Sequence, residues 1–261
     1  MKNNQENYPS FIKRVASVWY RHFRVYVRDF ISNAMPPFVE PMIFLGGIGL
    51  GLGTYILDMN GQSYSQFLAK GLLVTSAMFT ASFECTYGTY IRMEYDNIYD
   101  GMLAAPIRVF DLLFGEILWA GTKGMFFSTA VLSVFVSFGV ISLESCLIAP
   151  IIGFFTGIMF SVLSLLFTSF VNNINYFNFY FTGIVSPMFF FSGIVFPTTN
   201  LPSFLQPIIE FLPLTHSIRL IRRVSSGEIN NLLLLDVLYI LAFCIIVGYL
   251  AIKRLNKRLI D

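Results

Sequence analysis

The chain has 261 residues, of which 56% are hydrophobic and 12% are charged, and its formal net charge at pH 7 is +2. A mean hydropathy of +0.69 is far too high for a soluble domain of this length, so the composition predicts an all-α integral membrane protein. The small net charge gives no indication of a nucleic-acid partner.

Residues 1–34 are predicted to form a cytoplasmic amphipathic helix that connects to the membrane domain. Apolar and aromatic side chains recur at helical spacing from Ile12 to Phe30, while Arg14, Arg21 and Arg28 project to the opposite face. Such a helix lies at the headgroup boundary, and its basic face meets anionic lipid or a cytoplasmic partner. The residues leave these two roles open. The segment also lacks the continuous apolar region of a cleaved signal peptide.

Six later segments are apolar and of the length, roughly 20 residues, that crosses a bilayer. They lie near residues 36–57, 67–91, 112–141, 148–171, 177–196 and 232–252. Lysines and arginines gather in the N-terminal arm, in the loop after the second segment and in the C-terminal tail. The positive-inside rule therefore places both termini in the cytoplasm. Residues 35–261 are predicted to be one six-helix transmembrane domain.

The first predicted span is rich in glycine. Gly47 with Gly51, and Gly49 with Gly53, form two overlapping small-xxx-small pairs, which allow another helix to approach closely. The neighbour belongs either to the same subunit or to a second one, and the sequence leaves this open.

Two charged residues lie well inside predicted spans. Glu84 is about two turns before Arg92, and Lys123 lies at a similar depth in the next span. A charge at such a depth needs a partner, a wet cavity or a route to the interface. We expect Glu84 and Lys123 either to pair or to face one water-filled cavity, with unrelated burial of each group as the alternative.

The stretch Arg92–Leu103 carries three acidic and two aromatic residues and is predicted to be a short surface helix in the longest cytoplasmic loop between spans. Further on, SPMFFFSGIVFP at Ser186–Pro197 brackets three phenylalanines with proline and glycine. The proline-interrupted run Pro202–Leu214 is too short to span and predicts re-entrant helices before the last span. Arg219, Arg222 and Arg223 follow, and anchoring at the interface is the favoured interpretation, with an anionic substrate as the alternative.

The sequence contains no phosphate-binding loop, no HExxH or GxSxG motif, and no metal-like spacing of its cysteines or histidines. It is therefore not expected to be an enzyme or to hold a metal, and ATP-driven work would need another polypeptide. A proton-coupled secondary transporter would usually show internal repeats, which are not evident. A membrane scaffold without transport activity is a further alternative.

Three ordered runs resemble the ABC-2 type transporter permeases, with the nodulation-factor export branch as the nearest likeness. They are FVEPMIFLGGIGLGLG at residues 38–53, a run at 83–123 that includes YIRMEYDNIYDGML and FGEILWAGTK, and a run at 186–222 that begins SPMFFFSGIVFP. The resemblance implies six spans in a bacterial inner membrane and two permease copies, a homodimer in the simplest case. It also implies separate ATP-binding subunits, which would carry the ATP and Mg²⁺, so that this chain binds no cofactor itself.

The resemblance also implies roles for particular residues. Arg92–Leu103 would dock on the ATPase, with Glu94, Asp96 and Asp100 as contacts, Glu116 beside this joint, and Arg14 and Arg21 reaching the same partner. Phe189, Phe190 and Phe191 would form part of a dry gate. The expected cargo is an amphiphile, a lipid or a (lipo)oligosaccharide, and drug efflux is the alternative within the class.

Overall fold

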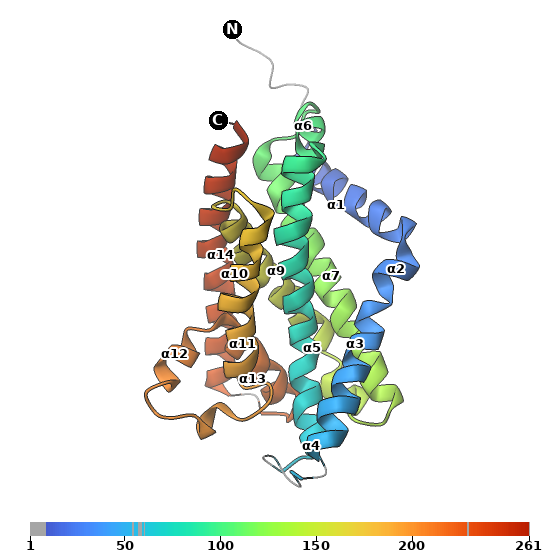
Figure 1. Cartoon of the computed structure of the whole chain (residues 1–261), viewed down its shortest axis with the longest axis vertical. Coiled ribbons are helices and arrows are strands. Elements are labelled where there is room, and N and C mark those ends of the chain that lie inside the picture. Colours follow the sequence, from blue (N-terminus) through green and yellow to red (C-terminus); the bar gives the residue numbers. More distant parts are fainter. Residues whose placement is uncertain (1–8, 54, 57–58, 60, 229, 261) are drawn as a thin grey trace.

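The computed structural model describes residues 9–53, 55–56, 59, 61–228 and 230–260, and these residues contain helices but no strand. The long helices are α5 (Tyr64–Phe83), α7 (Val109–Ser137), α9 (Ala149–Thr168) and α14 (Asn231–Ile260), which lie side by side in one bundle (Figure 1). The amino-terminal elements are α1 (Phe11–Arg28), α2 (Phe30–Ala34), α3 (Pro36–Phe44), the π-helix η1 (Leu45–Leu50) and α4 (Gly51–Gly53).

Shorter elements connect the long helices. Two π-helical segments, η2 (Glu84–Gly88) and η3 (Ile91–Tyr95), continue α5 without a break, and α6 (Ile98–Leu103) and α8 (Leu143–Cys146) flank α7. The segment before α14 contains η4 (Ile174–Tyr176), α10 (Phe177–Tyr180), η5 (Phe181–Val185), α11 (Ser186–Phe191), η6 (Thr198–Asn200), α12 (Gln206–Glu210) and α13 (Pro213–Ser225).

Among the described helices, three are both long enough and apolar enough to cross a membrane: Val109–Ser137, Leu143–Thr168 and Asn231–Ile260. The six-span arrangement therefore stays a prediction. The helical stretch expected over 177–196 ends at Phe191, because Ser192 leaves the helix and Gly193 adopts a φ of 89° that favours glycine.

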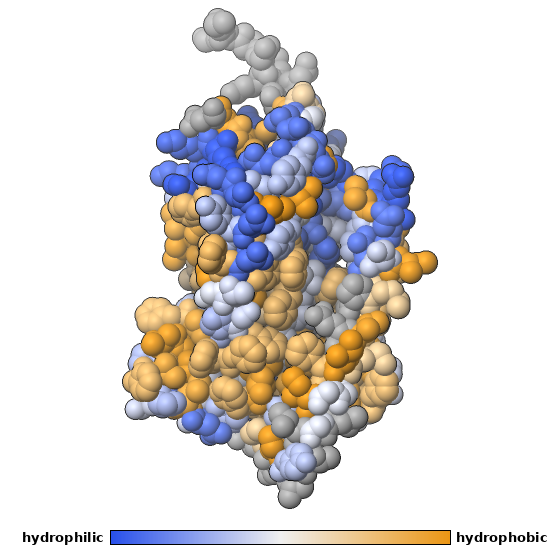
Figure 2. Space-filling model, in the orientation of Figure 1, coloured by the Kyte–Doolittle hydropathy of each residue, from blue (hydrophilic) through white to orange (hydrophobic). Residues whose placement is uncertain are grey.

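The two ends of the bundle differ in polarity. The beginning of α1 and the end of α14 lie at the same end as α6, whereas α4, α12 and α13 lie at the other (Figure 1). On the face shown in Figure 2, hydrophilic residues gather at the α6 end, and apolar residues form a broad belt over the rest. We refer to these as the α6 end and the α12 end.

The amphipathic helix α1 packs on α7, so that part of the apolar stripe predicted to face lipid contacts protein instead. Gly115 lets α1 approach, since a Cβ there would lie 2.7 Å from the Val18 side chain. Trp19 donates a 3.0 Å hydrogen bond to Thr122 on α7. Ile12, by contrast, is 77% exposed.

A very close helix contact joins α7 and α9, at glycines that the sequence analysis did not single out. A Cβ on Gly153 would lie 2.5 Å from the Cβ of Ser128, and one on Gly157 would lie 2.9 Å from the carbonyl oxygen of Ala120. Small residues on both faces thus allow the two backbones to meet.

The glycines of the first predicted span divide between two faces. A Cβ on Gly49 or Gly53 would lie 3.6 or 3.5 Å from the Ser65 hydroxyl at the start of α5, and this hydroxyl donates a 3.2 Å hydrogen bond to the Gly49 carbonyl. A Cβ on Gly47 or Gly51 would meet no atom of the described chain within 4 Å. One pair therefore packs within the subunit, while the other faces outward.

Candidate functional site

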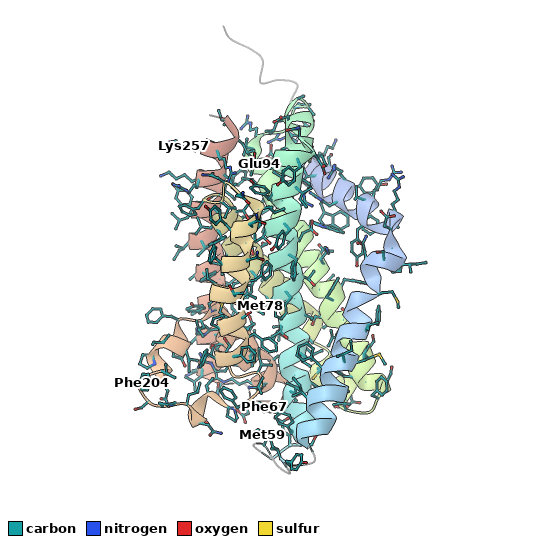
Figure 3. All side chains as sticks on the ribbon, viewed as in Figure 1. Met59, Phe67, Met78, Glu94, Phe204 and Lys257 are labelled. Carbon is teal, nitrogen blue, oxygen red and sulfur yellow. The ribbon has the colours of Figure 1, made fainter. Side chains whose placement is uncertain are left out.

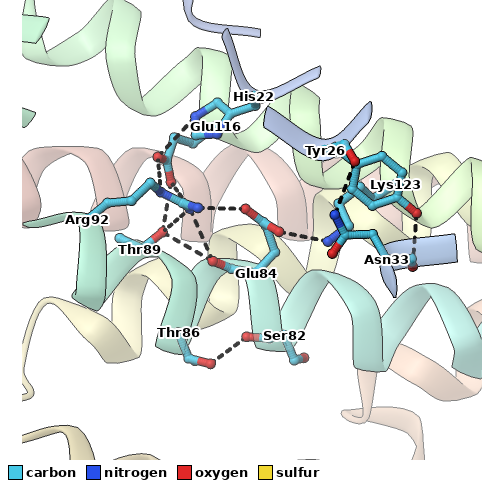
Figure 4. Close-up of polar contacts among 10 residues, drawn as sticks. All are labelled: His22, Tyr26, Asn33, Ser82, Glu84, Thr86, Thr89, Arg92, Glu116 and Lys123. Carbon is cyan, nitrogen blue, oxygen red and sulfur yellow. Dashed lines mark hydrogen bonds and ion pairs between the residues drawn. The ribbon is translucent and has the colours of Figure 1, made fainter. Parts of the chain in front are cut away.

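Glu84, the first residue of η2, accepts hydrogen bonds from two cations near the α6 end. Lys123 on α7 donates at 2.8 Å to one carboxylate oxygen, and Arg92 on η3 donates at 2.8 Å to the other (Figure 4). The carboxylate is only 13% exposed. The expected pairing of Glu84 with Lys123 is therefore present in the structure.

Arg92 also contacts a second buried carboxylate, Glu116 on α7. Its Nε donates to Glu116 Oε1 at 3.1 Å and its Nη2 donates to Oε2 at 3.2 Å, while the Thr89 hydroxyl donates to Oε2 at 2.7 Å. His22 of α1 places its Nε2 at 3.3 Å from Oε1. We call Glu84, Thr89, Arg92, Glu116 and Lys123 the charge network. Two carboxylates face two cations, so the buried charges compensate one another.

The helix that carries Glu84 and Arg92 departs from α-helical geometry at both residues. Glu84–Gly88 and Ile91–Tyr95 form wider π-turns, a feature found frequently at functional sites. Gly88 lies against the guanidinium, because a Cβ there would be 3.2 Å from Arg92 Nη1. The backbone carbonyl of Glu84 accepts a further hydrogen bond from Arg92 at 3.3 Å. Arg92 thus folds back along its own helix toward α7, instead of projecting from a loop as the sequence analysis expected.

A cavity of about 290 Å³ lies beside the charge network. Glu84, Arg92 and Lys123 line one side, and Arg21, His22, Val25, Tyr26, Asn33, Gly88, Ile91, Asp96, Ile98 and Trp119 line the rest. The pairing and the shared cavity, which were alternatives for Glu84 and Lys123, are therefore both present. Charged and aromatic groups from α1, α7 and the segment after α5 meet in this one place.

The acidic segment that follows the charge network is exposed. Glu94, Asp96 and Asp100 reach the surface, and Asn97 turns the chain with a φ of 50° before α6. Glu94 forms an ion pair with Arg258 near the end of α14, with 2.9 Å between Oε1 and Nη2. The three acidic side chains of this segment are therefore accessible, while the segment is fixed to the last helix by the Glu94–Arg258 pair.

Arg14, Arg21 and Arg28 of α1 lie in three different environments. Arg14 makes a bidentate contact with Asp111 of α7, at 2.6 Å from Nε and 3.2 Å from Nη2. Arg21 lines the cavity, and Arg28 is exposed. Arg14 therefore fixes α1 against α7.

The phenylalanines of α11 divide between the interior and the surface. Phe189 is buried, with its ring centroid 6.0 Å from that of Phe44 and 5.8 Å from that of Phe79. Phe190 and Phe191 are 54% and 42% exposed in the single chain. Only Phe189 closes the space between α3, α5 and α11.

A second ionic cluster lies at the α12 end, and the sequence analysis did not find it. Asp236 of α14 forms ion pairs with Arg219 at 2.8 Å and with Arg223 at 2.7 Å. The Nδ1 atom of His216 lies 2.8 Å from the same carboxylate. Glu210 of α12 binds Arg219 at 2.8 Å. Arg219 and Arg223 thus join three helices within the chain, and their anchoring at the interface stays a prediction.

The sequence has known relatives. The family model described as "ABC-2 type transporter" matches residues 13–224. Nodulation protein J of Sinorhizobium fredii is 33% identical over 94% of each chain, and that of Rhizobium leguminosarum bv. trifolii is 37% identical over 81% of each chain. The inner membrane transport permease YadH of Escherichia coli is 23% identical over 93% of this chain and 94% of its own length.

Proposed function

This chain belongs to the ABC-2 type transporter family, and we propose that it is the permease subunit of an exporter driven by a separate ATP-binding subunit. The cargo is an amphiphile, a lipid or a (lipo)oligosaccharide. The nodulation and transport names of the relatives support this class. ATP and Mg²⁺ are bound by the partner in this proposal, and the chain supplies the path through the bilayer.

In the proposed topology the α6 end is cytoplasmic. The beginning of α1 and the end of α14 lie there (Figure 1), and both carry basic residues, which agrees with the positive-inside rule. Six spans in the bacterial inner membrane would then place α12 and α13 at the outer surface. The outward-facing Gly47 and Gly51 offer a surface for the second permease copy.

The observation that carries the proposal is the connection from an exposed acidic segment to a buried charge network. Asp96 and Asp100 are free to meet a partner at the surface, and Arg92, close before them in the chain, holds both Glu84 and Glu116. A partner that moves residues 94–100 must therefore also shift the contacts between the α5–η3 helix and α7. Such a joint can couple two states if the partner binds one of them more tightly.

The other residues assigned from the sequence have supporting roles in this mechanism. Arg14 holds α1 beside the joint, and Arg21 lines the cavity there. The Glu84–Lys123 pair borders the cavity on the cytoplasmic side of the path, and the buried Phe189 would form the gate nearer the outer side, with the more exposed Phe190 and Phe191 next to it in the chain. Large apolar side chains there exclude water and ions while no cargo is present.

The experiment that tests this function starts from co-purification of the chain with an ABC ATPase. The complex is then reconstituted in liposomes, and ATP-dependent movement is measured for a panel of amphiphiles and lipid-linked sugars. Movement that requires both the partner and ATP hydrolysis is the expected result. Movement by the chain alone under a proton gradient would instead identify a secondary transporter.

A further inference from the structure

Arg222 on α13 is a partly buried cation near the α12 end. Its Nη2 donates to the backbone carbonyls of Phe67 and Ile194, both at 3.3 Å, and its guanidinium carbon lies 3.6 Å from the centroid of the Phe67 ring. Its Nε is buried and has no hydrogen-bond partner in the described part of the chain. Figure 3 shows the position of Phe67 close to the α12 end.

The neighbouring arginines on α13 differ from Arg222 in one respect. Arg219 and Arg223 each contact the Asp236 carboxylate. Within the described chain, Arg222 contacts no carboxylate and has only neutral carbonyl acceptors and the face of a ring. Enclosing a charge in this way is costly unless a counter-ion is available.

A second cation lies on the same side. Lys70, one turn after Phe67 on α5, donates to the side-chain oxygen of Gln62 at 2.8 Å. Residues three apart lie on the same face of a helix, so Lys70 is the neighbour of the Phe67 ring on which Arg222 stacks. Together the two side chains form a region of positive charge that the described carboxylates do not neutralise.

The turn after α11 covers this region. A Cβ on Gly71 of α5 would lie 3.0 Å from the Ile194 side chain, so the turn is in close contact with α5. Among the described residues of this turn, Ile194 makes the hydrogen bond to Arg222, through its carbonyl oxygen at 3.3 Å. An anion forms shorter and stronger hydrogen bonds with a guanidinium than a neutral carbonyl does, so an anionic group can replace these acceptors.

We propose that Arg222 and Lys70 form a binding site for an anionic oxygen group, such as a phosphate, at the α12 end. This assignment rests on the proposed function in one respect: in an exporter, the ligand is the anionic group of an amphiphilic cargo at the outer side of its path. Binding exchanges the carbonyls of Phe67 and Ile194 for the anion and releases the turn from α13. Binding of the cargo would thereby free the turn after α11, which covers the outer side of the path.

The test measures ligand binding by the purified full chain in dodecyl maltoside, a detergent without charge or phosphate. Dodecyl phosphate and inorganic phosphate are titrated separately by calorimetry. We expect saturable binding of dodecyl phosphate, weakened about tenfold or more in Arg222→Met, because a hydrogen bond to a charged group contributes about 1.5–3 kcal/mol. Equal affinity for inorganic phosphate identifies a free anion as the ligand, and much weaker binding of it identifies the headgroup of an amphiphile.

Arg254→Met is the matched control. Arg254 also stacks on a phenylalanine, with its guanidinium carbon 3.9 Å from the centroid of the Phe170 ring, but it belongs to the C-terminal half of α14. Its replacement should leave binding unchanged. Wild-type affinity in Arg222→Met overturns the proposal. If that variant does not fold, Lys70→Met carries the test, and unchanged affinity there overturns the proposal equally.

The assay needs neither a partner subunit nor ATP. A chain that binds no phosphate therefore removes this site and leaves the export function standing. If the chain binds phosphate but ATP-dependent export fails, the export function is removed and the binding site remains.

Discussion

Arg92 on η3 and Glu116 on α7 are joined by two hydrogen bonds, from Nε at 3.1 Å and from Nη2 at 3.2 Å. This pair attaches the beginning of the exposed acidic segment to α7. Helix α7 in turn packs on α1, α5 and α9, so it lies at the centre of the bundle's contacts. Any displacement of the segment must therefore be absorbed by a buried ionic contact.

The first prediction concerns Glu84 and Lys123. Glu84→Ala leaves Lys123 without its carboxylate and removes one partner of Arg92, so it should destabilise the chain by about 3 kcal/mol or more. Lys123→Ala should cost less, because Glu84 keeps Arg92. The double variant should be less destabilised than the sum of the two single variants.

Thermal unfolding of the detergent-purified variants gives the four corners of this cycle. Lys257→Ala, a change at an exposed lysine of α14, is the control and should leave the unfolding temperature unchanged. Simple additivity of the two single effects would contradict a paired interaction.

The second prediction concerns the acidic surface segment. Charge reversal of Asp96 and Asp100 to lysine should uncouple ATP hydrolysis from export while membrane insertion stays intact, because both carboxylates are exposed. Hydrolysis and export are measured in the reconstituted complex. Glu144→Lys, an exposed acid of α8, is the matched control. Undiminished export in the double reversal would remove the coupling role of these residues.

The third prediction concerns the close contact of α7 with α9. Gly153→Val should destabilise the chain by about 1–3 kcal/mol, as overpacking does in other cores, because even a Cβ would lie 2.5 Å from Ser128 Cβ. Gly47→Val should leave the unfolding temperature of the single chain unchanged, because nothing in the described chain lies within 4 Å of its Cβ. Equal effects of the two substitutions on unfolding would refute this distinction.

The fourth prediction concerns the Glu210–Arg219 contact. Hydrogen bonds from Arg219 lower the pKa of the Glu210 carboxyl from its ordinary value. A carboxyl whose pKa is lower in the folded state stabilises the fold above its unfolded pKa, about 4.3. That stabilisation disappears as the pH falls through the lowered value.

The unfolding temperature of the wild-type chain should therefore exceed that of Glu210→Gln at pH 6, and the difference should shrink as the medium is acidified. A difference that stays constant down to pH 3 would show that the ionised carboxyl is not responsible. Glu228→Gln, at an exposed acid after α13, serves as the control for general charge effects.

The helical architecture followed from the sequence, and the need of Glu84 and Lys123 for compensation followed as well, but their direct pairing was one of several alternatives until the structure showed it. Apolar runs of sufficient length predict membrane helices, and a charge at depth requires a partner. The burial of Arg92 did not follow. It depends on π-turns after Phe83, which alter the side-chain register in a way that α-helical spacing does not anticipate.

The arginines of α13, at the α12 end, are a second case in which the sequence did not predict the partners of charged side chains. Their spacing along one helix suggested a single function, yet Arg219 and Arg223 face Asp236 while Arg222 contacts Phe67 and Ile194. The difference comes from α5, α14 and the turn after α11, which meet α13 only in the folded chain.

The sequence by itself indicated that the protein lies in a membrane, because the chain is so apolar. In the hydrocarbon of a bilayer, the backbone must form its hydrogen bonds within helices. The sequence also indicated that Glu84 and Lys123 would need compensation. The tertiary structure alone decided which partner each charge received, and which glycines brought two backbones together. An ion pair or a close contact depends on distances of a few ångströms between segments far apart in sequence, and only the packing of the helices sets those distances.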